Sequence, residues 1–503
     1  MAGKVYLVGA GPGDVSLLTL KGKKLIEGAD VIVYDSLLGK GILAMIPGSV
    51  EAIDVGKRGG CHTMPQGRIN EILAEKAMEG KSVVRLKGGD PFLFGRGGEE
   101  AMYLRERNIP FEIVPGVTSA LAVPAYAGIP VTHRDMASMV HIVTGHKKGD
   151  MPLDIDFESL AKAGGTCVFL MGVSALEEIC QGLIRGGMGE DTPAAAVSLG
   201  ATAMQKEAAG TLKTLPKIVK NSELKAPAVI VTGRVCTCME MLNWRRYLPL
   251  SGKRIVVTRP RERSSEISKR LRDLGAEVIE LPGIRTVFRE ENRELKEALH
   301  QIASYDILAF TSPAGAGYFF RFLRKMEMDV RCLYGIKLAA IGEGTAEVLR
   351  ERGIFPEYVP KVYDGRSLGI LLREQAEENA RILLPRAKEG SAELTEELAK
   401  RKDLEVRDIA LYDTVLEKHP LIDLGEEIKA GEIRDAVFTS ASTVRGFRAA
   451  AAGADLSLVR AYCIGEKTAR EARAFGMRCV VAEEATVDAL VDVTVEVNQK
   501  AAF

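Results

Sequence analysis

The sequence predicts an α/β protein with parallel sheets, because short β-branched runs alternate with segments whose apolar residues have helical spacing. Several runs end in glycine or in a charged residue, most clearly in the stretch VVRLKGGDPFLFGRGGEE at 83–100. Paired glycines after a buried strand let the backbone approach a ligand closely, since no Cβ stands in the way. In open α/β sheets, ligands bind beyond the carboxyl ends of the strands. This stretch is therefore a candidate site, although a plain glycine turn before a helix would have the same pattern.

The composition is that of an ordinary globular protein, and it excludes several functional classes. The 503 residues suggest roughly three or four folding units. The 68 basic and 68 acidic residues cancel, which argues against a nucleic-acid binder held by a global positive field. No apolar run approaches membrane-spanning length, and the N-terminus turns to glycine and aspartate too soon for a signal peptide. The eight cysteines and six histidines are scattered, which favours reduced thiols, a cytoplasmic location and no metal site.

The N-terminal turn GAGPGD at 9–14 invites comparison with a dinucleotide-binding fingerprint. The match fails, because the third glycine would fall on Asp14 and Pro12 removes a backbone donor. The surrounding pattern is β-α-β and so predicts a parallel sheet. The expected elements are strands at 4–10 and 30–35, a helix at 19–28, a strand ending in VGKR at 55–58 and a helix at 66–79.

Four charged residues stand at the ends of these expected strands, namely Asp35, Lys57, Arg85 and Asp90. In a parallel sheet the carboxyl ends lie along one edge, so the four side chains are expected to face a common cleft. For any one of them alone, a solvated charge at a strand end is the plainer interpretation.

A second α/β unit is expected to follow the first. A strand at 110–115 precedes Thr118 and Ser119, which are residue types that cap helices. Met171 follows one of the later strands; it is a core-filling residue in most settings, although a thioether at a strand end could pack on a ligand. The later strands are expected at 139–144, 166–171, 194–199 and 227–232.

A segment at 243–254 contains the only tryptophan, several cations and Pro249, and it is typical of a linker. Beyond it the chain repeats itself loosely, which favours an internal duplication into two lobes around a cleft. Helix N-termini with threonine and serine hydroxyls bind carboxylates well, and Arg259 and Arg386 would add bidentate partners. The echoed pairs are 254–259 with 381–386, 308–312 with 436–440, and 340–346 with 463–469.

Two families share these motifs. The first 245 residues or so resemble uroporphyrinogen-III C-methyltransferase, through GAGPGD, VYD at 33–35, VGKR, RLKGGDPFLFGRGGEE, PGVTSA at 115–120, GIPVTHRD at 128–135 and VTGH at 143–146. The second half resembles uroporphyrinogen-III synthase, through IGEGTA, LYDT at 411–414, TSAS at 439–442 and IGEKTA. The resemblance implies a two-lobed tetrapyrrole methyltransferase fold followed by a bilobed synthase fold with parallel sheets. The implied domains are 1–245 (lobes about 1–115 and 116–245), a linker at 246–252, and 253–503 (lobes about 253–285 plus 418–498, and 286–417).

For the first half, the resemblance implies S-adenosylmethionine as methyl donor and two methylations of uroporphyrinogen III to precorrin-2. Asp35 would be the base and Lys57 the acid, with Arg85 near the substrate. Arg58 and Arg134 would hold substrate carboxylates. Donor-site positions fall on Pro12, Gly88, Gly89, Asp90, Leu93, Thr118, Ser119, Met171 and Gly200.

For the second half, the resemblance implies closure of hydroxymethylbilane to uroporphyrinogen III without a cofactor. Tyr412 would assist departure of the hydroxyl group. The other expected substrate contacts are Thr311, Ser312, Thr345, Arg386, Thr439, Ser440 and Thr468.

The family also implies a homodimer through the methyltransferase half, small tetrapyrrole substrates, and neither nucleic-acid nor membrane partners. Nothing like a dehydrogenase and chelatase module precedes Met1, so this chain alone is not expected to make siroheme, although it would serve the siroheme or cobalamin route. Two alternatives stay open. The second half could be a non-catalytic bilobed tetrapyrrole-binding module, and the first half could methylate a later corrin intermediate.

Overall fold

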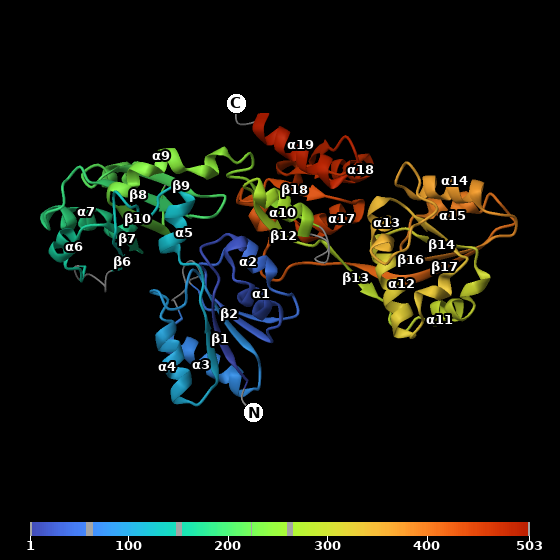
Figure 1. The fold of residues 1–503 in the computed structure, drawn as a ribbon, viewed down its shortest axis with the longest axis horizontal. Coiled ribbons are helices and arrows are strands. Elements are labelled where there is room, and N and C mark those ends of the chain that lie inside the picture. The colour runs from blue at the N-terminus through green and yellow to red at the C-terminus, as the bar shows by residue number, and fades with distance from the viewer. Residues whose placement is uncertain (1–2, 57–63, 147–152, 223, 259–264, 501–503) are drawn as a thin grey trace. The chain divides into compact units, whose positions relative to one another are not determined.

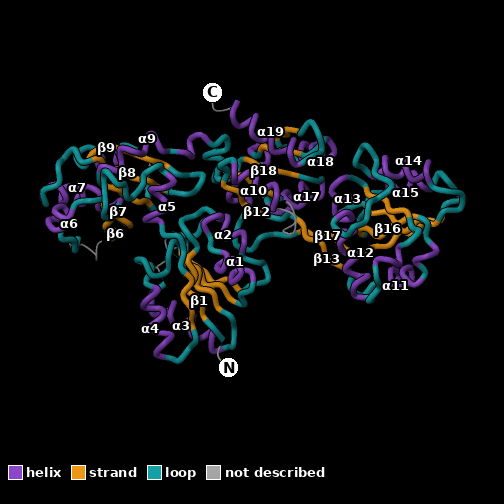
Figure 2. The backbone as a smooth tube through the Cα atoms, viewed as in Figure 1, coloured by secondary structure: helices purple, strands orange, loops and turns teal. Residues whose placement is uncertain are grey.

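The computed structural model describes residues 3–56, 64–146, 153–222, 224–258 and 265–500. These described residues form four five-stranded sheets, each with helices against it (Figures 1 and 2). Two compact units contain them: residues 1–281, 419–444 and 450–503 form the first unit, and residues 282–418 and 445–449 form the second. No helix in the described part of the chain is long and apolar enough to span a membrane.

The first sheet is entirely parallel, as the β-α-β pattern predicts, with strand order β3-β2-β4-β1-β5. Helices cover both of its faces, and successive side chains of a strand pack on opposite sides. Val83 packs with α3 and α4 on one face, and Val84 packs with α1 and α2 on the other (Figure 1). The bounds are β1 Val5–Gly9, α1 Leu20–Glu27, β2 Val31–Tyr34, α2 Lys40–Met45, β3 Glu51–Asp54, α3 Gln66–Met78, β4 Val83–Lys87, α4 Gly97–Glu106 and β5 Phe111–Val114.

The second sheet has the order β6-β7-β10-β8-β9 and is mixed. β6 and β7 are parallel, whereas β10 is antiparallel to both β7 and β8, so β6, β7 and β8 end at the same edge. α5 begins directly after the first sheet and packs its body on this second one. The sequence reasoning missed β9. The bounds are α5 Ser119–Tyr126, β6 Val140–Thr144, α6 Phe157–Ala163, β7 Thr166–Leu170, α7 Leu176–Arg185, β8 Pro193–Ser198, β9 Lys206–Thr211, α8 Leu215–Lys220, β10 Ala228–Thr232 and α9 Met239–Leu242.

The third sheet, in the first unit, is parallel with the order β12-β11-β18-β19-β20. α10 and α19 contribute to the apolar core against one of its faces. The bounds are β11 Arg254–Val257, α10 Ser265–Asp273, β12 Glu277–Glu280, α16 Leu424–Lys429, β18 Asp435–Phe438, α17 Ala441–Ala450, β19 Arg460–Cys463, α18 Glu466–Ala474, β20 Arg478–Val481 and α19 Val487–Lys500.

The fourth sheet, in the second unit, has the order β13-β17-β16-β14-β15, with only β13 antiparallel to its neighbour. α12 and α13 pack on one face, and α14 and α15 pack on the other. The bounds are β13 Ile284–Phe288, α11 Arg293–His300, β14 Ile307–Phe310, α12 Pro313–Lys325, β15 Lys337–Ala340, α13 Glu343–Arg350, α14 Gly365–Gln375, β16 Arg381–Ala387, α15 Ala392–Leu398 and β17 Glu405–Leu416.

The third and fourth sheets share a strand order, which supports the internal duplication suggested by the sequence. The run β12-β11-β18-β19 in one corresponds to β17-β16-β14-β15 in the other, and all of these strands are parallel to their neighbours. Each echoed sequence pair falls on a corresponding strand pair: β11 with β16, β18 with β14, and β19 with β15. The exact lobe boundaries stay a prediction; β13 begins at Ile284, so a boundary after 285 would cut this strand.

Candidate functional site

Four glycine backbones meet at the carboxyl edge of the first sheet. Gly89 donates its N–H to the carbonyl of Gly11 at 2.8 Å, and Gly11 returns a hydrogen bond of 3.2 Å. A Cβ at Gly116 would lie 2.2 Å from the carbonyl oxygen of Gly89 and 2.7 Å from the Cα of Gly9. Side chains cannot be accommodated at this distance, so glycine is required for the strand ends to come together. The result is an edge lined by backbone.

Asp90 fixes the loops at this edge. Its Oδ1 accepts hydrogen bonds from the N–H groups of Phe92 and Leu93, at 2.8 and 3.1 Å, and its Oδ2 accepts one from Gly116 at 3.0 Å. Both carboxylate oxygens are thus engaged with backbone. The Leu93 side chain packs against the apolar core of the second sheet. Asp90 therefore fixes the shape of the loops that follow β4 and β5.

The other expected donor-site residues lie at strand ends of both sheets. Thr118 caps α5 by accepting a hydrogen bond from the N–H of Ala120 at 3.2 Å, and Ser119 begins the helix. Pro12 lies in the turn after β1, and in this turn a Cβ on Gly13 would come within 2.7 Å of the Thr202 side chain. The turn after β1 therefore lies against the loop that follows β8.

Met171 and Gly200 follow β7 and β8, at the shared edge of the second sheet. Met171 has φ 57° and is half exposed, and Leu199 and Ala201 on either side of Gly200 also have positive φ. Such conformations are strained for residues with a Cβ, and they gather at functional sites. A Cβ at Gly200 would overlap the side chain of Val123 on α5. The expected donor residues thus lie at the carboxyl edges of the first and second sheets.

A group of buried charges lies next to this edge; we call Asp35, Arg85, Lys87 and Glu100 the buried charge cluster. Glu100 is fully buried, and Arg85 and Lys87 are 3% and 4% exposed. The Oε1 atom of Glu100 lies 3.1 Å from the Nε of Arg85 and 3.0 Å from the Nζ of Lys87. On the other side, the Nη2 of Arg85 lies 3.7 Å from the Oδ2 of Asp35. The structure therefore brings together Asp35 and Arg85, as expected from the sequence.

The sequence did not lead us to expect Lys87 and Glu100 in this cluster. The sequence does contain a pattern that could have identified them. Arg85 and Lys87 are two residues apart on a strand and so share a face, and Glu100 lies in the first turn of the next helix. Burial and the neighbouring Arg85 charge lower the pKa of Lys87 from its ordinary value, while Glu100 and Asp35 oppose this shift.

The remaining expected residues of the first half do not join the cluster. Lys57 and Arg58 lie outside the described residues. Arg134 is exposed in the turn closed by the bridge between His133 and Ala137, and it forms no ion pair with any residue the structure describes. A substrate contact by Arg134 stays a prediction.

In the second unit, Tyr412 and Ser312 meet. Their hydroxyl oxygens are 2.8 Å apart, and the Ser312 hydroxyl also accepts a hydrogen bond from the N–H of Gly315 at 2.9 Å, which caps α12. Tyr412 is only 5% exposed and pairs with Ala387, the last residue of β16. The pair thus lies at the carboxyl edge of the fourth sheet, with Thr311 directly before Ser312.

Thr345 and Arg386 are both buried. Thr345 is 1% exposed in the first turn of α13, and its Oγ1 has no hydrogen-bond partner among the described residues. The guanidinium of Arg386 forms a bidentate ion pair with Asp408, with one contact of 2.8 Å, and donates to the carbonyl of Ser391 at 2.7 Å. Arg386 is therefore engaged within the fold, and its contact with substrate stays a prediction.

The corresponding residues of the first unit have the same placement in the third sheet. Thr439 and Ser440 lie between β18 and α17, and the Ser440 hydroxyl is 3.0 Å from that of Ser442. Thr468 is 5% exposed in the first turn of α18, the position that Thr345 has in α13. Arg259 lies outside the described residues.

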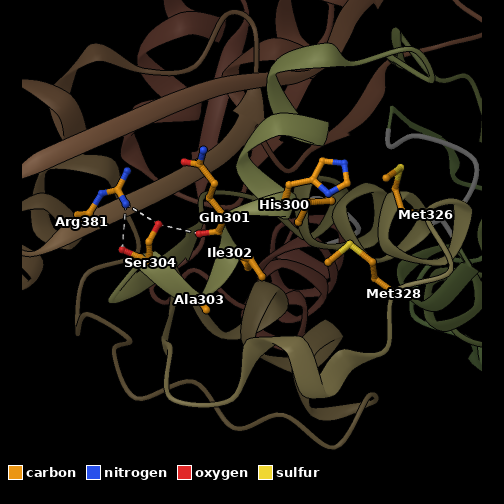
Figure 3. A pocket seen from close by; sticks show the side chains of 9 residues that line it. His300, Gln301, Ile302, Ala303, Ser304, Met326, Met328 and Arg381 are labelled. Atoms are coloured by element: carbon orange, nitrogen blue, oxygen red, sulfur yellow. Dashed lines mark hydrogen bonds between the residues drawn. The ribbon is translucent and has the colours of Figure 1, made fainter.

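A hollow of about 730 Å³ in the second unit contains none of these residues (Figure 3). Arg381, the first residue of β16, donates to the Ser304 carbonyl there (Figure 3). The hollow is therefore at the amino end of this strand, away from the Ser312–Tyr412 pair. Its lining is Leu299, His300, Gln301, Ile302, Ala303, Ser304, Met326, Met328 and Arg381.

The fold and these strand-end groups define a two-part α/β protein, with a glycine-lined edge in the first part and a duplicated sheet in the second. The family of tetrapyrrole (corrin/porphyrin) methylases matches residues 4–216, and that of uroporphyrinogen-III synthase HemD matches residues 265–492. A porphyrin biosynthesis protein HemD of Ruminiclostridium josui is 43% identical over 99% of this chain and 98% of its own length. The chain belongs to the family in which a tetrapyrrole methylase is fused to a uroporphyrinogen-III synthase.

Two further similarities concern the first half of the chain. An S-adenosyl-L-methionine-dependent uroporphyrinogen III methyltransferase of Methanosarcina barkeri is 54% identical over 48% of this chain and 96% of its own length. A solved uroporphyrin-III C-methyltransferase from Thermus thermophilus, complexed with S-adenyl homocysteine, is 37% identical over 47% of this chain and 99% of that one, with a TM-score of 0.41.

Proposed function

We propose that this chain is a bifunctional enzyme of tetrapyrrole synthesis. The second half closes hydroxymethylbilane to uroporphyrinogen III, and the first half methylates that product twice with S-adenosylmethionine to give precorrin-2. The observation that carries the proposal is that one relative named for porphyrin biosynthesis spans both parts end to end, while each part matches its own enzyme family. The product of one family is the substrate of the other, so their fusion in one chain is chemically consistent.

The backbone-lined edge of the first sheet suits S-adenosylmethionine. This donor has no phosphate, so the missing N–H of Pro12 costs nothing, and close backbone approach is available at Gly88 and Gly89. When bound, the donor supplies a methyl group on a sulfonium. Transfer from a sulfonium depends mainly on proximity and alignment, which the loops held by Asp90 provide. The residues proposed to hold it are Pro12, Gly88, Gly89, Asp90, Leu93, Thr118, Ser119, Met171 and Gly200.

Asp35 is the proposed proton acceptor in methyl transfer. As the new carbon–carbon bond forms and the carbon–sulfur bond breaks, the macrocycle must release one proton for each methyl group it gains. The Asp35 carboxylate is 22% exposed and can reach substrate, whereas Arg85 behind it is buried. A carboxylate at this position can accept the proton as a general base, and the Arg85 guanidinium beside it contributes to its placement. Lys57 is the proposed acid, and Lys57, Arg58 and Arg134 would hold the substrate's peripheral carboxylates.

In the second half, the Tyr412 hydroxyl is proposed to donate a proton to the hydroxyl group that leaves hydroxymethylbilane. The loss of water leaves an electrophilic carbon that closes the ring, and no cofactor is required. The threonines and serines at strand ends and helix starts would bind substrate carboxylates. These are Thr311, Ser312, Thr345, Thr439, Ser440 and Thr468, with Arg386 as the proposed cation.

One experiment on the full chain tests both activities. Enzymatically generated hydroxymethylbilane is supplied with and without isotopically labelled S-adenosylmethionine, and products are separated by isomer and weighed by mass spectrometry. Without donor, we expect uroporphyrinogen III, the type III ring, in which the last pyrrole is inverted; the type I ring lacks this inversion. With donor, we expect a product heavier by two labelled methyl groups. A type I ring alone would overturn the synthase assignment in favour of a binding module. A type III ring that gains no label would overturn the methyltransferase assignment.

Two further expectations belong to this proposal. We place the protein in the cytoplasm, which is supported by free thiols at the seven described cysteines. We also propose a homodimer through the methyltransferase half, which light scattering on the purified chain tests directly.

A further inference from the structure

We propose that Glu100 and Lys87 are positioning residues for methyl transfer, which control how much of the positive charge of Arg85 acts on Asp35 and thereby the pH range of the reaction. This inference rests on the proposed methyltransferase function. It concerns the buried charge cluster alone, all of whose members lie in the first sheet and its connecting segments.

Arg85 stands between two carboxylates and cannot move freely. Its Nη1 donates to the carbonyl oxygens of Leu86 and Val33, at 3.1 and 3.4 Å, in addition to its contacts with Glu100 and Asp35. With the guanidinium held by backbone and 3% exposed, water screens it little. The effect of Arg85 on Asp35 is therefore set by the neighbouring charges.

Glu100 is the counter-charge of two cations at once. Arg85, Lys87 and the side-chain amide of Gln66 all donate to its Oε1, the last at 3.2 Å. Its Oε2 is buried and has no hydrogen-bond partner among the residues that the structure describes. Burying a carboxylate costs free energy, and the two cations beside Glu100 offset part of that cost.

Four segments supply charged and polar groups near Glu100: β4, the turn after β2, α3 and the start of α4. β4 supplies Arg85 and Lys87, and the turn after β2 supplies Asp35. α3 supplies two neutral amides, Gln66 and Asn70, which hydrogen-bond each other at 2.9 Å. At the start of α4, the exposed side chains of Arg96 and Glu99 form an ion pair, with contacts of 2.9 and 2.8 Å, so their charges cancel. The cluster thus holds two cations and two carboxylates.

This balance predicts opposite effects from two substitutions. Glu100→Gln removes the competing carboxylate, so Arg85 and Lys87 act on Asp35 alone and favour its ionised form. Lys87→Met removes a cation and leaves more of the Glu100 charge uncompensated, which disfavours ionised Asp35. Adding or removing one neighbouring charge shifts the pKa of a carboxyl by about one unit. Burial and Arg85 lower the pKa of Lys87, while Glu100 and Asp35 act to raise it, so this lysine interacts with both carboxylates.

The test is the pH profile of kcat/KM for methylation of uroporphyrinogen III by the full chain. We expect the acid limb to move to lower pH in Glu100→Gln and to higher pH in Lys87→Met, by about half to one pH unit each. Gln66→Leu is the matched control, because it removes a hydrogen bond to the same Glu100 oxygen without changing charge, and its acid limb should stay with the wild type. Titrating substrate carboxylates are common to all four proteins and cancel in the comparison.

The inference would be overturned if the acid limbs of the Glu100→Gln and Lys87→Met profiles moved in the same direction or did not move. A merely structural role would lower stability without shifting the two limbs in opposite directions. S-adenosylhomocysteine binding by calorimetry shows which variants are folded. If Glu100→Gln does not fold, the test rests on Lys87→Met: a shift of its acid limb to higher pH supports the inference, and no shift overturns it. An inactive wild type would instead overturn the proposed function, so the two failures are distinguishable.

Discussion

The hydroxyl of Tyr412 lies 2.8 Å from that of Ser312, the residue that caps α12. Residues 100 positions apart in the chain thereby meet at the N-terminal end of a helix. The N-terminal end of a helix has a partial positive charge, so the two hydroxyls lie where negative charge is stabilised. The tyrosine is largely buried, so its orientation is fixed by packing.

Replacement of this tyrosine should affect catalysis more than folding. We expect Tyr412→Phe to slow formation of the type III ring by about 100-fold, in the range of a lost general acid. Stability should fall by only about 1 kcal/mol, since the ring is retained and one hydrogen bond is lost. Isomer analysis and chemical denaturation measure the two effects.

Tyr318 provides the matched control. Its ring centroid lies 5.4 Å from that of Tyr412, and its hydroxyl contacts Thr286 at 2.7 Å. Tyr318→Phe removes a neighbouring hydroxyl of the same kind and should leave ring closure near the wild-type rate. Equal slowing in both variants would assign the effect to packing.

Asp35→Asn should separate methyl transfer from donor binding. The amide keeps the size of the side chain but cannot accept the proton, so we expect methylation to fall by at least about 100-fold. The affinity for S-adenosylhomocysteine, measured by calorimetry, should stay within about threefold. Asp30 is the control, because it lies before the same strand and holds the N–H of Ser82 at 2.8 Å; Asp30→Asn should not reduce methylation. Equal loss of affinity and turnover in Asp35→Asn would contradict its role as proton acceptor.

Asp90→Ala should have the opposite profile. It leaves three backbone N–H groups without their acceptor, which costs about 2–4 kcal/mol of folding free energy. Because these groups shape the donor loops, S-adenosylhomocysteine affinity should fall more than tenfold. Asp156→Ala removes a comparable cap, on the N–H of Ser159 in α6, and should leave that affinity unchanged. Undiminished affinity in Asp90→Ala would show that the loops hold their shape without the carboxylate.

Gly116→Ala should disrupt the edge of the first sheet. The new Cβ would lie 2.2 Å from the backbone oxygen of Gly89, and backbone cannot move aside as a flexible side chain can. We expect lower thermal stability and loss of donor binding. Gly67→Ala, in α3 with open space around its Cβ, should be neutral or stabilising by about 0.5–1 kcal/mol. A fully stable Gly116→Ala variant would mean that the strand ends can separate.

Much of the first sheet follows from local pattern. Strands such as β2 are apolar on both faces because helices cover both sides, and such runs are recognisable in sequence. Glycine spacing likewise located the edge where Gly89 and Gly116 meet. β9 was missed because its sequence, KEAAGT, has little β-propensity; the strand is stabilised by pairing with β8, a contact that lies outside its own residues.

The sequence alone determined the α/β class, the order of the two enzyme families and the duplication of the second half, because periodicity, glycine placement and repeated motifs are properties of neighbouring residues. Only the tertiary structure decided which charges meet. Arg386, whose contact with substrate stays a prediction, is paired with Asp408, and Glu100, which the pattern places merely in a helix, is the shared partner of Arg85 and Lys87. The physical reason is that an ion pair depends on distance in space, which the packing of a helix on a strand sets and which spacing along the chain does not.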